Sequence, residues 1–160
     1  MIENFFGDAF FAAIAAIGFS AISNPPIKAY LFCALIAATG HSIRFLLMTP
    51  EFAGIGIILA STVASFVIGV LAVVLSPCVK IPAETFLFPS LLPMIPGIYA
   101  YKAFGGLAMC LFHTSEPVFH HYFYLFSTNG LVCFFVIAGM VIGGTLPIFM
   151  LKRIAYMATR

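Results

Sequence analysis

One stretch of 25 residues, Phe52 to Ser76, contains no ionisable side chain, and this feature constrains the fold more than any other. About 20 mostly apolar residues are enough for a helix to cross the hydrocarbon core of a bilayer. Four further apolar runs flank this stretch, and none alternates apolar and polar residues as a transmembrane strand would. We therefore expect an all-α, polytopic transmembrane helical bundle of about five spans, over residues 5–23, 29–48, 52–76, 83–112 and 117–150.

Composition supports a membrane protein, because 63% of the residues are hydrophobic and only 8% are charged. A water-soluble domain carries roughly 25% charged residues. We expect a single integral membrane domain over residues 1–160, in contact with membrane lipid. The net charge of +2 is small and scattered, and no basic run has interleaved aromatic residues, so we expect no nucleic-acid partner.

The charges between the apolar runs predict the orientation of the chain. Glu3 and Asp8 stand where a secretory signal would carry Lys or Arg, so we expect a retained first helix. The largest basic cluster is in the C-terminal tail, at Lys152, Arg153 and Arg160. By the positive-inside rule, the N-terminus is expected outside and the C-terminus in the cytoplasm, which requires an odd number of spans. A four-span bundle, with residues 29–48 half-submerged, is the alternative.

Two ionisable residues, His41 and Arg44, lie within the second apolar run. They are three residues apart, so on a helix they share one face and are separated by about one turn. A guanidinium in the bilayer costs at least about 2.5 kcal/mol unless it is paired or hydrated. One interpretation is that Arg44 extends to the following loop and pairs with Glu51. A second is that both side chains face an anionic group, and a purely structural polar contact is the third.

The fourth run is interrupted by prolines, which cannot donate the backbone hydrogen bond that continues a helix. Pro93, Pro96 and Gly97 place the break near the middle of this run. Unpaired amides at the start of the resuming helix would favour an anionic substrate group. The polar residues that follow the break directly are Tyr99, Tyr101 and Lys102. A kinked helix with interfacial tyrosines and a snorkelling lysine is the alternative.

Gly139 and Gly143 have the GxxxG spacing that lets two helix backbones approach closely. We expect helix packing there, and a homo-oligomer through this face is one alternative. The histidines at 113, 120 and 121 lack the companions of a metal site, so no metal is expected. The chain contains no phosphate-binding loop, no zinc-protease motif and no serine-hydrolase motif. We therefore expect neither an enzyme nor a cofactor, and transport is the leading class.

Two segments, NPPIKAYLFCALIAATGHSIRFLLM and PSLLPMIPGIYAYKA, resemble the small subunit of the split type of the threonine/serine exporter family. The resemblance runs from about Ala12 to the tail. Its most specific parts are the GHxxR pattern at Gly40, His41 and Arg44 and the PxxPGxYxY pattern over residues 93–101. Such subunits resemble the C-terminal membrane half of full-length exporters and work with a larger membrane partner. Some of these pairs are associated with succinate export.

The resemblance implies one subunit of a secondary exporter in the bacterial cytoplasmic (inner) membrane, driven by an ion gradient. Its substrate would be a small zwitterionic or anionic molecule, such as threonine, serine or a dicarboxylate. Our hypothesis is that Arg44 binds a substrate carboxylate, with His41 as a titratable neighbour. Pro93, Pro96 and Gly97 would break the fourth helix so that its amides and Tyr99 complete the site, while Tyr101 and Lys102 vary within the family. The alternative function is a non-transporting scaffold that stabilises a partner membrane protein.

Overall fold

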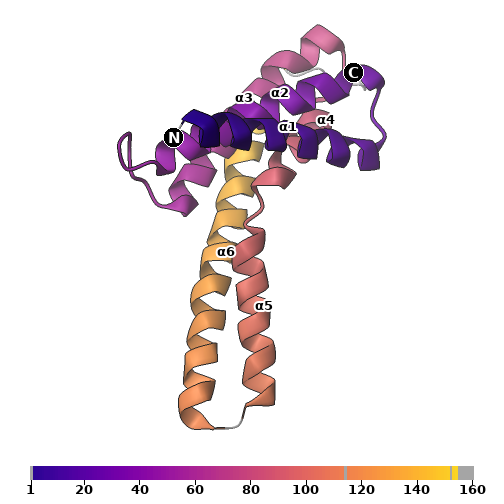
Figure 1. Cartoon of the computed structure of the whole chain (residues 1–160). Coiled ribbons are helices and arrows are strands. Elements are labelled where there is room, and N and C mark those ends of the chain that lie inside the picture. Colours follow the sequence, from indigo (N-terminus) through magenta and orange to yellow (C-terminus); the bar gives the residue numbers. More distant parts are fainter. Residues whose placement is uncertain (1, 114, 152, 155–160) are drawn as a thin grey trace. The chain divides into compact units, whose positions relative to one another are not determined.

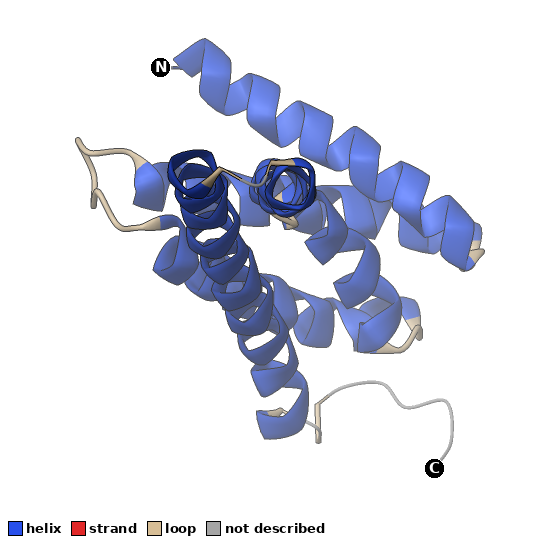
Figure 2. Ribbon diagram, turned by 90° about the horizontal axis from the view of Figure 1, so that it is seen from below, coloured by secondary structure: helices blue, strands red, loops and turns tan. Residues whose placement is uncertain are grey.

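The computed structural model describes residues 2–113, 115–151 and 153–154, which form helices and connecting loops without a strand (Figure 1, Figure 2). The expected all-α class is therefore confirmed. The helices are α1 (Ile2–Ser23), α2 (Ile27–Met48), α3 (Ile57–Val79), α4 (Ala83–Leu91), the 3-10 helix η1 (Leu92–Met94), α5 (Gly97–Phe112) and α6 (Glu116–Met150).

Four helices, α1, α2, α3 and α6, are long and apolar enough to cross a membrane. The segment formed by α4, η1 and α5 passes the same test as an interrupted pair, so the count rises to five if this pair is one broken span. The chain is thus a multi-pass membrane protein. The orientation of its termini stays a prediction, and Lys152 and Arg160 of the basic tail lie outside the described residues.

The chain divides into two compact units, Met1–Met94 with Gly139–Arg160, and Ile95–Ala138. The first unit contains α1 to α4, η1 and the C-terminal end of α6. The second contains α5 and the part of α6 that lies before Gly139. Each unit has its own packing, and the ionisable residues of the second apolar run belong to the first unit.

Small side chains form much of the core of the first unit. The helices α1 and α2 pack side by side (Figure 1) and are joined by Asn24, Pro25 and Pro26. Pro26 is the N-cap residue of α2. Alanines with no exposed surface include Ala16 in α1, Ala37 in α2 and Ala64 in α3. Because lipid provides no hydrophobic drive between helices, such small residues favour association by allowing close backbone packing.

The C-terminal end of α6 packs against α3 through the glycines of the GxxxG pattern. A Cβ atom on Gly143 would lie 2.5 Å from the carbonyl oxygen of Thr62 and 3.3 Å from the amide nitrogen of Phe66. A Cβ atom on Gly139 would collide with the hydroxyl of Thr62. Both glycines therefore lie against a helix of the same chain.

The third helix begins later than its apolar run. The sequence predicts a helix from Phe52, whereas α3 begins at Ile57. The amides of Phe52, Ala53 and Gly54 all donate to the Thr49 carbonyl oxygen, at 3.0, 3.2 and 3.1 Å. Gly54 has a φ of +58°, which glycine adopts without steric cost. Apolar side chains therefore continue through a turn, which is why hydropathy places the helix start too early.

The break in the fourth run lies after Pro89, since α4 continues through that residue. A proline leaves the carbonyl four residues earlier without its helical donor. Here that carbonyl, of Thr85, accepts a weak hydrogen bond from Cys33 Sγ of α2 at 3.7 Å. The chain leaves helical geometry between the end of η1 at Met94 and the start of α5 at Gly97.

The second unit is a hairpin formed by α5 and the part of α6 before Gly139. A Cβ atom on Gly106 would lie 2.9 Å from both the amide nitrogen of Phe126 and the carbonyl oxygen of Tyr122, so these two helices touch closely there. The helix α6 begins at Glu116 and has Pro117 in its first turn, where a missing amide donor costs little.

Candidate functional site

The first unit brings together three ionisable side chains, Asp8 of α1 and His41 and Arg44 of α2, which we call the charged cluster. His41 Nδ1 lies 3.0 Å from Asp8 Oδ2, and Arg44 Nη2 lies 3.5 Å from the same Nδ1. The three-residue connection makes α1 and α2 an antiparallel hairpin. A residue near the start of α1 therefore meets residues in the last two turns of α2.

Burial makes these contacts energetically important. The side chain of His41 is 7% exposed and that of Asp8 is 37% exposed. An ionised group removed from water is tolerated where an opposite charge or a hydrogen bond compensates for the lost hydration. Asp8 supplies that opposite charge close to His41 and Arg44. No direct ion pair joins Asp8 to Arg44 in the described part of the chain.

The position of one proton decides how the charged cluster is bonded. A neutral imidazole has one nitrogen that donates and one that accepts. With the proton on Nδ1, His41 donates to Asp8, which agrees with the shorter of the two distances. With the proton on Nε2, Nδ1 accepts from Arg44 instead. The buried Nε2 atom has no partner within ordinary hydrogen-bond geometry among the described residues.

Arg44 also contacts the segment at the break of the fourth run. Its Nη1 donates to the carbonyl oxygen of Met94 at 2.9 Å. Met94 is fully buried and is the last residue of η1, where the helical hydrogen-bond pattern stops. The guanidinium therefore satisfies a carbonyl at the end of a helix. Among the described residues, Arg44 makes no ion pair with Glu51.

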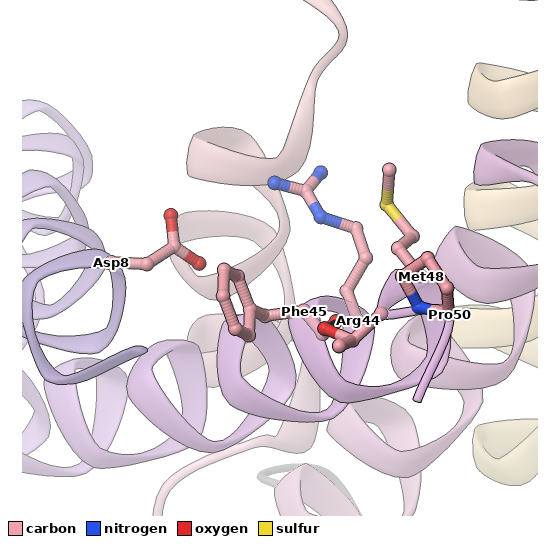
Figure 3. Close-up of a pocket in the computed structure, with 6 residues that line it drawn as sticks. Asp8, Arg44, Phe45, Met48 and Pro50 are labelled. Carbon is pink, nitrogen blue, oxygen red and sulfur yellow. Dashed lines mark hydrogen bonds between the residues drawn. The ribbon is translucent and has the colours of Figure 1, made fainter. Parts of the chain in front are cut away.

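A pocket of about 380 Å³ lies beside the charged cluster. Figure 3 shows Asp8 extending from one helix and Arg44 from another toward this space. The other lining residues are Phe45, Met48, Thr49 and Pro50. Small-molecule sites typically measure about 300–1,000 Å³ and combine apolar walls with a few polar groups. This pocket is at the small end of that range and offers one acidic and one basic group.

Gly40 keeps α2 close to its neighbours beside the charged cluster. A Cβ atom at this position would lie 2.5 Å from Cγ1 of Ile68, a fully buried residue of α3, and 3.7 Å from Sδ of Met94. Glycine therefore allows α2 to approach α3 next to the residue whose carbonyl Arg44 binds. This is a packing reason for the glycine in the GHxxR pattern.

The other predicted site residues divide between the two units. Pro93 is in η1, directly before Met94, in the first unit. Pro96, Gly97, Tyr99, Tyr101 and Lys102 belong to the second unit. There, Tyr101 and Lys102 line a separate pocket of about 740 Å³ whose other walls include Tyr122 and Asn129 of α6.

Asp8 is a candidate that sequence reasoning missed. The charge count assigns it to the N-terminal flank, although it lies inside the first apolar run at residues 5–23. An ionisable residue within an apolar span is by itself a sign of function. That signal was sufficient to include Asp8, but its partner on α2 is 33 residues away and follows only from the packing of the two helices.

The fold and the charged cluster define a multi-pass α-helical membrane protein with polar residues of the kind that line transport pathways. The chain belongs to the threonine/serine exporter (ThrE) family, whose model matches residues 8–150 and thus includes the whole charged cluster. The family resemblance that the sequence motifs indicate is therefore confirmed.

A relative from Haemophilus influenzae, an uncharacterized protein, is 34% identical to this chain over 140 residues. The aligned region covers 87% of this chain but 46% of the relative, so the chain spans about half the length of that protein. No solved structure matches the chain.

Proposed function

We propose that this chain is one membrane subunit of a secondary exporter for small amino acids or dicarboxylates in a bacterial cytoplasmic membrane. Membership of the exporter family supports transport as its activity. The resemblance of its motifs to the split type of this family supports a larger partner subunit. The observation that carries the proposal is the charged cluster beside a small pocket, since an apolar chain keeps buried charges chiefly for function.

In this proposal Arg44 binds a carboxylate of the substrate. A guanidinium has five N–H donors in a planar arrangement that matches a carboxylate. One donor is used by the Met94 carbonyl, which holds the side chain in place beside the pocket. The remaining donors leave capacity for a bidentate contact with a substrate carboxylate.

His41 is proposed to couple transport to a proton gradient. Histidine is the side chain that most readily changes charge near neutral pH. Export driven by an inward proton gradient requires the proton and the substrate to occupy the site alternately, so that the proton moves in as the substrate moves out. Because coupling between two ligands is reciprocal, a proton on His41 that alters the bonding of Asp8 and Arg44 changes the affinity of the site for substrate.

The residues around the break are proposed to complete the substrate path. Pro93, Pro96 and Gly97 interrupt the helix, and Tyr99 follows on α5. Tyr101 and Lys102 are proposed as further contacts from the pocket of the second unit. Single alanine substitutions at Tyr99, Tyr101 and Lys102, read by efflux, test each contribution separately.

Efflux of labelled threonine, serine and succinate tests the proposed function directly. Cells produce this chain alone, the larger subunit alone, or both, and export is expected when both are present. Arg44→Ala should reduce export about tenfold or more, the loss typical of a hydrogen bond to a charged group. Arg44→Lys should restore little, because an ammonium cannot form the same two-pronged contact. Lys28→Ala, at an exposed cation of the same helix, is the matched control.

The same variants separate transport from scaffolding. A scaffold requires Arg44 for assembly, so Arg44→Ala would then reduce co-purification of the two subunits. A transport subunit keeps the complex and loses efflux. Unchanged efflux with Arg44→Ala at normal membrane levels contradicts the proposed role of Arg44.

A further inference from the structure

The opposite charges of the charged cluster occupy one pocket without neutralising each other directly. Asp8 and Arg44 both line the pocket of about 380 Å³ (Figure 3). They make no direct ion pair in the described part of the chain, and each is held by another group instead. Asp8 Oδ2 is bonded to His41 Nδ1, and Arg44 Nη1 is bonded to the Met94 carbonyl oxygen.

This arrangement leaves binding capacity on both charges. A carboxylate offers about four acceptor positions, and the His41 contact at 3.0 Å uses one of them. The 37% exposure of the Asp8 side chain leaves the carboxylate accessible. Arg44 likewise retains donors after its bond to Met94. The pocket therefore presents an acceptor for a cation and a donor for an anion at the same time.

We propose that Asp8 is the residue that determines which charge class of substrate this site accepts. The inference rests on the proposed function, in which Arg44 binds a carboxylate. An α-amino acid carries an ammonium beside its carboxylate, and Asp8 can accept a hydrogen bond from that ammonium. A simple carboxylate or a dicarboxylate has no such group, and the negative charge of Asp8 repels it. Asp8 thus selects zwitterions and disfavours anions.

A matched pair of substrates isolates this effect. Glycerate is serine with a hydroxyl in place of the ammonium, so the two molecules share size and carboxylate but differ in net charge. Uptake of each labelled substrate is measured in inverted membrane vesicles from a strain that lacks the native gene and is complemented with each variant. The native partner is then present in every sample. The measured quantity is the ratio of the serine rate to the glycerate rate.

We expect wild-type protein to favour serine, and Asp8→Asn to lower the ratio about tenfold or more, the loss typical of one charge-assisted hydrogen bond. Asp8→Asn should also raise succinate transport relative to serine. Asp8→Glu keeps the charge and should keep the preference for serine. Asp8→Ser serves as the second uncharged variant if Asp8→Asn does not accumulate in membranes.

Three outcomes overturn the inference. The first is an unchanged ratio with active Asp8→Asn. The second is loss of both substrates with an uncharged variant that is present in membranes, since Asp8 would then act in the whole cycle and not in selection. The third is a wild-type protein that transports succinate but neither serine nor threonine. Arg44→Ala tests the proposed function separately, because it should reduce transport of every substrate about tenfold or more and not alter the ratio alone.

Discussion

His41 Nδ1 faces two groups that require opposite proton positions. It can donate to Asp8 at 3.0 Å or accept from Arg44 at 3.5 Å, but a single nitrogen cannot do both. When His41 is protonated on both nitrogens it donates to Asp8 and repels Arg44. Asp8 from α1 and Arg44 from α2 are the charged groups in contact with this ring, and η1 contributes the backbone carbonyl that holds Arg44. The bonding of the charged cluster therefore depends on protonation.

The first prediction concerns the variant His41→Asn. The amide nitrogen of Asn can still donate toward Asp8, but it does not gain or lose a proton. We expect wild-type efflux of labelled threonine to vary with pH between about 5 and 8, the range in which histidine changes charge. The variant should reach the membrane normally and show a rate that is nearly constant over this range.

The control for this prediction is His120→Asn. His120 is 70% exposed and pairs with Glu116 one turn away on α6, so its substitution should leave the pH profile of efflux unchanged. A pH profile of His41→Asn that matches the wild type would exclude His41 as the titrating group. Equal changes in both variants would point to a general effect on the membrane or the gradient.

Sequence spacing identified His41 and Arg44 but not their partners. Three residues of separation on one helix are enough to place the two side chains on one face. Asp8 and Met94 are brought to them by the packing of α1 and η1, 33 and 50 residues away along the chain. Such contacts depend on which helix faces are adjacent, and hydropathy carries no information about that.

At the scale of helices, neither prolines nor apolarity alone predicts the ends, since α3 continues through Pro77 to Val79 and α4 continues through Pro89. The end of α1 before Pro25 and the break before Gly97 follow from residues that cannot continue a helix. The start of α3 does not follow from such residues, because the apolar residues from Phe52 continue through a turn whose amides donate to the Thr49 carbonyl. Apolar composition describes the environment of a segment, whereas backbone hydrogen bonding decides its conformation.

The close contact between α6 and α3 gives a prediction for Gly143→Ala. The added methyl would meet the Thr62 carbonyl oxygen at 2.5 Å, and a backbone atom cannot move aside as a side chain can. Overpacking of this kind costs about 1–3 kcal/mol. We expect the midpoint of thermal unfolding in detergent micelles to be lower for Gly143→Ala than for the wild type. The loss of the helical circular dichroism signal on heating measures this midpoint.

Gly130→Ala, in the same helix, is the matched control for Gly143→Ala. A Cβ atom there would lie 3.8 Å from Cβ of Ala103, an ordinary contact, so the change should be neutral or slightly stabilising through helix propensity. Equal unfolding midpoints for the two variants would show that α6 and α3 do not pack as closely as described.

For the whole molecule, the number of spans depends on the segment between α3 and α6. The helix α4 has 9 residues, η1 has 3 and α5 has 16, so neither side of the break alone reaches the length of about 20 that a span requires. Together they form one broken span, or they enter and leave the bilayer on the same side. The helix α6, with 35 residues, is about 52 Å long and exceeds the roughly 30 Å hydrocarbon core in either case.

The location of the C-terminus separates these two topologies, and we predict that it is cytoplasmic. With the N-terminus outside, one broken span gives five crossings, whereas a re-entrant segment gives four and leaves the C-terminus outside. A fluorescent protein fused after Arg160 should therefore be fluorescent, and alkaline phosphatase at the same position should be inactive. Phosphatase fused after Gly56, in the loop that follows two crossings, should be active in both topologies and serves as the control. Active phosphatase at the C-terminus, with the Gly56 fusion also active, would show that α4, η1 and α5 do not cross the membrane.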